Sequence, residues 1–206
     1  MKKQVVLLKG WEAKENYKDF YDCLAKQDYN PFEKKTKKWS DNLWEVLWKN
    51  FEFINFPRPN SSFADYKAWK IMFEKLLPFL KWEVIFVGHS LGGTFLAKYF
   101  DEDFKGWIQD SPLHYNIKKI ILVAPAFKDD ENEVIWSFNF KNNALENLKK
   151  ISEKITIFWS KDDFVVPFED FLDFKKVLPK AKFFEFENYG HFLGEEYREI
   201  LEEIKK

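Results

Sequence analysis

Short apolar runs alternate along this chain with segments whose apolar residues recur at helical spacing. Most of the runs are continuous, which is the pattern of strands that are buried on both faces. The expected strands are Val5–Leu8, Phe51–Phe56, Val84–Val87, Ile117–Val123, Ile155–Trp159 and Lys182–Phe186. The alternation predicts an α/β protein with three layers, in which a mostly parallel sheet of about six strands is flanked by helices.

The segments between these runs predict amphipathic helices. Apolar side chains share one face around Tyr17–Leu24 and around Trp69–Leu76, the second after a cap at Ser61 or Ser62. Further helices are expected at Leu91–Phe100, Phe168–Val177 and Phe192–Ile204.

The length of 206 residues predicts a single domain, residues 1–206, with one core and one active site. Two stretches interrupt the rhythm, Phe127–Lys141 and Asp28–Asn50. The stretch Asp28–Asn50 has a lysine-rich run followed by Trp39, Leu43, Trp44, Leu47 and Trp48. It is either a lid or a peripheral helical insertion. The peripheral helix is favoured, because a tryptophan face of this kind usually packs on a core while the lysines stay solvated.

Composition narrows the class of protein further. Apolar residues make up 46% and aromatic residues 20% of the chain, which excludes disorder as the main interpretation. The 33 basic and 34 acidic residues nearly cancel, so nucleic acid and anionic membranes are not expected partners, and a small molecule is. The single cysteine, Cys23, excludes an intramolecular disulfide. No apolar run approaches the ~20 residues of a spanning helix, so a cytoplasmic protein is expected.

The most informative segment is Gly88-His89-Ser90-Leu91-Gly92, a Gly-x-Ser-x-Gly motif between an apolar strand and an expected helix. A serine on such a tight turn exposes its hydroxyl as a nucleophile, and the glycines avoid collisions with the neighbouring backbone. The first amides of the helix point toward the serine, so the Leu91 N–H can donate to an oxyanion. The motif predicts Ser90 as nucleophile; a glycine-rich turn without chemistry is the less favoured alternative.

A serine nucleophile needs a general base, and the chain has three histidines. His89 adjoins the serine, and its side chain is expected to pack or hydrogen-bond beneath the turn. His114 lies in a polar connection and is expected at the surface. His191 follows the last strand, which places it at the same edge of a parallel sheet as Ser90. His191 is therefore the predicted base.

The base should be oriented by a carboxylate on a loop after an intervening strand. Two candidates follow the fifth strand, Asp162 and Asp163, and the second stands four residues before Pro167. The chain order Ser, Asp, His is the order of α/β hydrolases. On the residues alone either aspartate is a candidate, and Asp162 is alternatively a cap of the turn.

With these segments in place, the chain resembles the small serine hydrolases related to retinoblastoma-binding protein 9 and the bacterial YdeN-like proteins. The resemblance covers nearly the whole chain and is carried by Leu8–Trp11, Phe56–Asn60, Gly88–Gly93, Leu122–Pro125, Asp162–Pro167 and Gly190–Phe192. It implies an α/β-hydrolase fold without a large cap domain and a triad of Ser90, Asp163 and His191. It also implies a second oxyanion donor, the backbone N–H of Trp11, and no metal or organic cofactor.

The expected function is hydrolysis of a small carboxylic ester, or of an amide, through an acyl-enzyme intermediate. The aromatic composition favours an apolar acyl or alcohol group, with Trp136 and Phe138 as candidates for the pocket wall or, alternatively, ordinary core residues. Two other functions stay open. The same residues could transfer an acyl group to another acceptor, or the fold could act mainly as a protein-interaction module through Asp28–Asn50.

Overall fold

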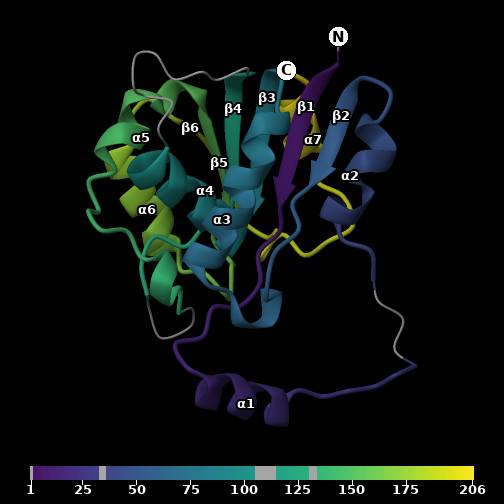
Figure 1. The fold of residues 1–206 in the computed structure, drawn as a ribbon, viewed down its shortest axis with the longest axis vertical. Coiled ribbons are helices and arrows are strands. Elements are labelled where there is room, and N and C mark those ends of the chain that lie inside the picture. The colour runs from purple at the N-terminus through teal and green to yellow at the C-terminus, as the bar shows by residue number, and fades with distance from the viewer. Residues whose placement is uncertain (1, 33–35, 105–114, 130–133) are drawn as a thin grey trace.

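A parallel six-stranded sheet forms the centre of the computed structural model, which describes residues 2–32, 36–104, 115–129 and 134–206 (Figure 1). The strand order is β2-β1-β3-β4-β5-β6, and each neighbouring pair is parallel. The strands are β1 (Lys3–Leu8), β2 (Phe51–Asn55), β3 (Trp82–His89), β4 (Tyr115–Val123), β5 (Ile155–Ser160) and β6 (Lys182–Phe186). The six predicted strands and the three-layer α/β architecture are confirmed.

Two hydrophobic cores lie on opposite faces of this sheet. Successive side chains of a strand point to opposite faces, so Val6 and Leu8 of β1 belong to one core, and Val5 and Leu7 belong to the other. The first core is covered by α3 (Tyr66–Leu76), α4 (Leu91–Lys98) and α6 (Phe168–Val177), and the second by α2 (Trp39–Leu47) and α7 (Arg198–Lys205).

The other helical segments are short or peripheral. They are α1 (Tyr17–Lys26), α5 (Glu146–Lys150), a π-helical turn at Tyr99–Asp103, and 3₁₀ turns at Ser61–Phe63, Leu77–Phe79, Trp136–Phe138 and Ser152–Lys154. Within the described ranges, none of the helices has both the length and the apolar character that crossing a bilayer requires.

Two predicted helix starts are wrong. The helix expected to be capped at Ser61 or Ser62 begins only after Asp65, whose side chain accepts a hydrogen bond from the Ala68 N–H at 2.9 Å. The last helix begins at Arg198 rather than Phe192. Phe192 has a φ of 53°, which is outside the range of a right-handed helix. Its carbonyl accepts a hydrogen bond from Trp39 Nε1 at 3.0 Å, so this residue belongs to the loop before the helix.

The stretch Asp28–Asn50 contains α2. Its buried side, formed by Trp39, Leu43 and Leu47, packs on the second core. Trp44 and Trp48 lie on the other side and are each 53% exposed. Lys34 and Lys35 lie outside the described residues.

Helix α1 covers neither face of the sheet and has no buried residue. It lies beyond the carboxyl ends of the strands (Figure 1). The Tyr17 ring stacks on the Phe63 ring with centroids 4.8 Å apart, and Phe20 meets the same ring edge-on at 5.8 Å. These aromatic contacts join α1 to the loop that follows β2.

The strand order indicates where a functional site is expected, at the carboxyl ends of β1 and β3. From β1 the chain proceeds to β2 on one side and then crosses to β3 on the other. Loops that leave two such strands diverge at their carboxyl ends, and open α/β sheets bind ligands at this switch point. Here the two loops carry Gly10-Trp11 after β1 and Ser90-Leu91 after β3.

Candidate active site

Ser90 stands between β3 and α4 with an unfavourable backbone conformation. Its φ of 54° and ψ of −130° are rare for any residue other than glycine. The flanking glycines make the turn possible: a Cβ on Gly88 would lie 2.5 Å from the Gly92 carbonyl oxygen, and one on Gly92 would lie 2.2 Å from the Leu8 carbonyl oxygen. The motif thus forms a sharp strand-to-helix turn with the serine at its apex.

The loop after β1 approaches this turn closely. A Cβ on Gly10 would lie 2.6 Å from Ser90 Cβ and 2.9 Å from the Leu91 nitrogen. Within the described part of the chain, neither the Leu91 N–H nor the Trp11 N–H donates a hydrogen bond. Two unsatisfied amides beside a serine can stabilise an oxyanion.

Arg58 fixes the peptide that joins Gly10 to Trp11. Its Nη1 donates a hydrogen bond of 2.6 Å to the Gly10 carbonyl oxygen, and its guanidinium lies 5.8 Å from the centre of the Trp11 ring. The C=O and N–H of a trans peptide point in opposite directions. By holding the Gly10 carbonyl, Arg58 therefore turns the Trp11 N–H away from itself.

His191 and Asp163 are paired at the carboxyl ends of β6 and β5. His191 Nδ1 lies 2.9 Å from one carboxylate oxygen of Asp163 and 3.0 Å from the other. The Asp163 side chain is only 1% exposed, and it also accepts hydrogen bonds from the backbone N–H groups of Val165 and Val166. A carboxylate held in this way keeps a proton on Nδ1 and leaves Nε2 free to act as a base.

The neighbouring Asp162 has a different position. Its Oδ1 accepts hydrogen bonds from Ser160 Oγ at 2.5 Å and from the Gly190 N–H at 2.8 Å. These two hydrogen bonds lower the pKa of its exposed carboxyl group. Asp162 therefore ties the loop after β5 to the loop that carries His191, whereas Asp163 contacts the imidazole itself.

His89 supports the His191 loop from beneath the turn. Its Nε2 lies 2.8 Å from the His191 carbonyl oxygen, which can only accept, so Nε2 carries the proton. Burial, and then the neighbouring His191, lower the pKa of His89 to about 3, which keeps the ring neutral at physiological pH. Trp39 of α2 supports the same loop, because its backbone N–H donates to the Gly194 carbonyl at 2.8 Å.

The structure brings the predicted site residues to one sheet edge but does not hydrogen-bond all of them. The Ser90 hydroxyl makes no hydrogen bond to any residue in the described ranges, His191 included. Catalytic hydrogen bonds are often long in proteins without substrate and tighten when it binds. The third histidine of the sequence, His114, lies outside the described residues.

The predicted pocket residue Phe138 lies in the core. It is fully buried, and its ring contacts Trp69 and Tyr66 edge-on at 5.2 and 5.7 Å. Its assignment to the pocket wall is therefore wrong, and the alternative of an ordinary core residue holds, because a substrate could reach this ring only by displacing the packed aromatic side chains. Trp136 is partly exposed and stays a candidate.

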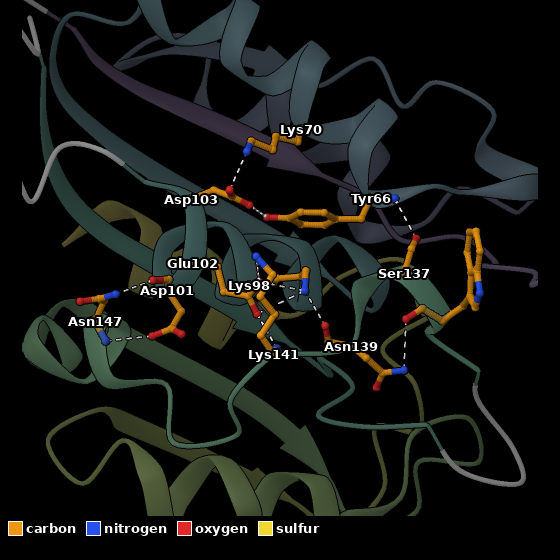
Figure 2. Close-up of polar contacts among 11 residues, drawn as sticks. Tyr66, Lys70, Lys98, Asp101, Glu102, Asp103, Ser137, Asn139, Lys141 and Asn147 are labelled. Carbon is orange, nitrogen blue, oxygen red and sulfur yellow. Dashed lines mark hydrogen bonds and ion pairs between the residues drawn. The ribbon is translucent and has the colours of Figure 1, made fainter.

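A polar network fixes the segment around Trp136 to the end of α4 (Figure 2). Lys98 Nζ donates to the Asn139 carbonyl at 2.5 Å and pairs with Glu102 at 3.1 Å. Asp103 accepts from both Tyr66 and Lys70, and Asp101 accepts from the backbone N–H groups of residues 147 and 148. The network therefore holds the carboxyl end of α4, the helix that follows Ser90.

The supporting roles of Arg58, Trp39 and Lys98 were not predicted from the sequence. Each of these side chains acts on the backbone of a residue 41 or more positions away. Arg58 and Trp39 lie in two segments that the sequence singles out, Phe56–Asn60 and Asp28–Asn50, and Lys98 lies in the expected helix Leu91–Phe100, but no pattern relates these side chains to their backbone partners. No group of three or more metal-ligating side chains occurs among the residues that the structure describes.

The fold and the site at the switch point define the class of this protein as an α/β hydrolase. Its backbone is similar to that of the ydeN gene product from B. subtilis, with a TM-score of 0.71, 18% identity, and 98% of this chain and 97% of that chain covered. It is also similar to a putative YdeN-like hydrolase from Pectobacterium atrosepticum, with a TM-score of 0.60, 16% identity, and coverages of 98% and 89%.

The family follows from the sequence. The model of the serine hydrolase family matches residues 34–205, and the chain belongs to this family. A third similar structure is a lipase-esterase related protein from Clostridium acetobutylicum, with a TM-score of 0.59, 12% identity, and coverages of 98% and 93%. No curated protein matches the chain. Family and fold together make the protein a hydrolase and leave its substrate open.

Proposed function

We propose that this hydrolase cleaves a small carboxylic ester, or less readily an amide, with Ser90 as nucleophile, His191 as general base and Asp163 as the group that orients the base. The observation that carries the proposal is the pairing of His191 with the buried Asp163, at the same sheet edge as the strained Ser90 turn. A base held by a carboxylate at the same sheet edge as a serine nucleophile is the arrangement that acyl transfer requires.

The first half of the reaction forms an acyl-enzyme. His191 Nε2 takes the proton from the Ser90 hydroxyl as its oxygen attacks the carbonyl carbon of the substrate. The carbonyl oxygen becomes negatively charged and is stabilised by the N–H groups of Leu91 and Trp11. His191 then gives the proton to the leaving alcohol or amine as the bond to the carbonyl carbon breaks.

The second half releases the acyl group. His191 takes a proton from a water molecule, and the resulting hydroxide attacks the acyl carbon. The proton returns to Ser90 as the carboxylic acid leaves. Asp163 accepts a hydrogen bond from His191 Nδ1 throughout and stabilises the imidazolium that forms in each half.

An ester is favoured over an amide because it needs less protonation of its leaving group. The aromatic side chains near the edge, including the half-exposed Trp11 and the partly exposed Trp136, favour a substrate with an apolar group on one side. No metal or organic cofactor takes part in this mechanism, and every step uses residues of this chain and water.

Steady-state kinetics with p-nitrophenyl esters of increasing acyl length test the proposal, with the matched p-nitroanilides as amide substrates. The expected result is ester turnover that Ser90→Ala abolishes and a covalent acyl adduct on Ser90 in the intact protein by mass spectrometry. Ester turnover that persists in Ser90→Ala would contradict the proposal. Added alcohols or amines separate hydrolysis from acyl transfer, because a transferase would divert most of the acyl group to them.

A further inference from the structure

A cavity of about 480 Å³ is lined by residues of α1 and of the segment that follows β2. One wall carries polar side chains from the segment after β2, namely Arg58, Asn60, Ser61 and Ser62. The other wall consists of the rings of Tyr17, Phe20 and Phe63. The Arg58 hydrogen bond to the Gly10 carbonyl connects this cavity to the candidate oxyanion site, because Gly10 lies against Ser90.

The charge of Arg58 is not neutralised locally. Arg58 forms no ion pair with any residue in the described ranges, and its hydrogen bond to the Gly10 carbonyl uses one of its five N–H donors. The carboxylate that acts on it electrostatically, Asp41, is already bonded to Lys9. A half-buried guanidinium with unused donors, facing a cavity, is therefore available to an anion.

The rest of the polar wall is also available. The side chains of Asn60, Ser61 and Ser62 make no hydrogen bond to other described residues, so they can donate to a ligand. The opposite wall is held together by the stacking of Tyr17 on Phe63 and offers an apolar aromatic surface. The two walls together suit a ligand that has a charged end and a small apolar or aromatic body.

We propose that this cavity binds a carboxylate group of the substrate, so that the enzyme acts on esters or amides with one carboxylate-bearing, otherwise apolar end. The proposal rests on the hydrolase function proposed above and specifies its substrate class. A monoanion is favoured over a phosphate dianion, because Arg58 is the one cation among the described residues that line the cavity, and the Lys9 charge is balanced by Asp41.

A binding measurement tests the site without relying on catalysis. Benzoate and its neutral analogue benzamide are titrated into the wild-type protein, Arg58→Met and Arg198→Met by calorimetry. Arg198→Met is a matched control, because it removes an exposed arginine on α7 that pairs with Glu202 and does not line the cavity. Benzoate is expected to bind at least tenfold more tightly than benzamide to the wild type and to Arg198→Met, and to lose this advantage in Arg58→Met.

Equal binding of the two compounds, or a benzoate preference that survives Arg58→Met, would overturn the proposal. Tighter binding of phenyl phosphate than of benzoate would overturn the assignment to a monoanion.

Kinetics with paired substrates connect the site to the reaction. Phenyl pentanoate is compared with the phenyl monoester of glutaric acid, and phenyl butyrate with 4-carboxyphenyl butyrate, so that the charge lies on either end of the ester. In at least one pair the wild type should favour the carboxylate in kcat/KM by tenfold or more. Arg58→Met should remove this preference through a higher KM for the charged substrate.

Arg58→Met also weakens the support of Gly10, but that loss affects both members of a pair and cancels in their ratio. If both members are hydrolysed with equal efficiency by wild type and Arg58→Met, the cavity does not bind the substrate's carboxylate and the hydrolase function stands. If no ester is turned over and Ser90 acquires no acyl group, the proposed function fails, and the benzoate titration still decides whether Arg58 binds an anion.

Discussion

The two sides of the candidate active site differ in how completely their polar groups are bonded. On the side of β5 and β6, both oxygens of Asp163 have partners, and the His191 backbone is held by His89. On the side of β1 and β3, Ser90 has a strained backbone, and the N–H groups of Leu91 and Trp11 have no acceptor among the described residues. One side positions a base in advance, whereas the other keeps donors free for a charge that exists only during the reaction.

The largest expected effect comes from the two residues that exchange the proton. We expect Ser90→Ala and His191→Ala each to lower kcat by roughly 10⁴-fold or more, and the double variant to lose little beyond either single one, because the two residues act as a unit. Ester turnover and circular dichroism of the three variants check this. Additive losses in the double variant would contradict a shared role.

The next effect distinguishes the two neighbouring aspartates. Asp163→Asn should lower kcat by about 10³- to 10⁴-fold, because an asparagine can present an N–H to Nδ1 and favour the wrong tautomer of the base. Asp162→Asn keeps an oxygen for the Ser160 and Gly190 donors and should cost less than about tenfold. The two variants change the same chemical group at adjacent positions, so similar losses of kcat would contradict the assignment of Asp163.

A smaller effect is expected on the oxyanion side. A Cβ on Gly10 would lie 2.6 Å from Ser90 Cβ, so Gly10→Ala must displace the loop that carries the Trp11 N–H. The loss of one oxyanion donor typically costs about 10²-fold or more in kcat. Gly10→Ala should therefore lower kcat by about 10²-fold with little change in KM, as measured with the best p-nitrophenyl ester. A change confined to KM would show that the loop binds substrate without stabilising the oxyanion.

The smallest effect concerns the dependence of stability on pH. Burial, and then His191, lower the pKa of His89 to about 3 from an ordinary value of 6.5. The unfolded chain therefore binds a second proton on the His89 ring more tightly than the folded protein does. The contribution of the neutral His89 ring to stability is complete above pH 6.5 and is lost as pH falls toward 3. Each pH unit in this window removes up to about 1.4 kcal/mol.

His89→Asn removes this titration and keeps an N–H donor for the His191 carbonyl. Urea unfolding at several pH values between 7.5 and 4.5 should show a flatter acid limb for the variant than for the wild type. Parallel curves would mean that the His89 ring is protonated in the folded state or is not buried.

The fold was largely predictable from local patterns in the sequence. The central strands of this parallel sheet are buried on both faces, so runs such as Val84–Val87 and Ile155–Trp159 identify strands without knowledge of their neighbours. The Gly-x-Ser-x-Gly motif is local as a sequence pattern, although Gly92 is also required by the close approach of the Leu8 carbonyl of β1. The strand order was not predicted, because it depends on which of several crossovers the chain follows.

The features that the sequence did not predict correctly depend on contacts between segments that are far apart in the chain. The start of α7 was placed too early, because its apolar spacing extends into Phe192, whose carbonyl is engaged by Trp39 far away in the sequence. Phe138 looked like a pocket residue in an aromatic stretch, but it is buried against Trp69. Arg58 has no sequence pattern that relates it to Gly10, and only the folded chain brings the guanidinium to that carbonyl.

Covalent labelling with a fluorophosphonate tests the central claim most directly, because this probe reacts with a serine whose hydroxyl is activated by a base. The wild-type protein should acquire one adduct, mapped to Ser90 by peptide mass spectrometry. Labelling should disappear in Ser90→Ala, slow strongly in His191→Ala and Asp163→Asn, and stay near the wild-type rate in Asp162→Asn. An adduct on another residue, or labelling of Ser90 at an unchanged rate without His191, would contradict the account.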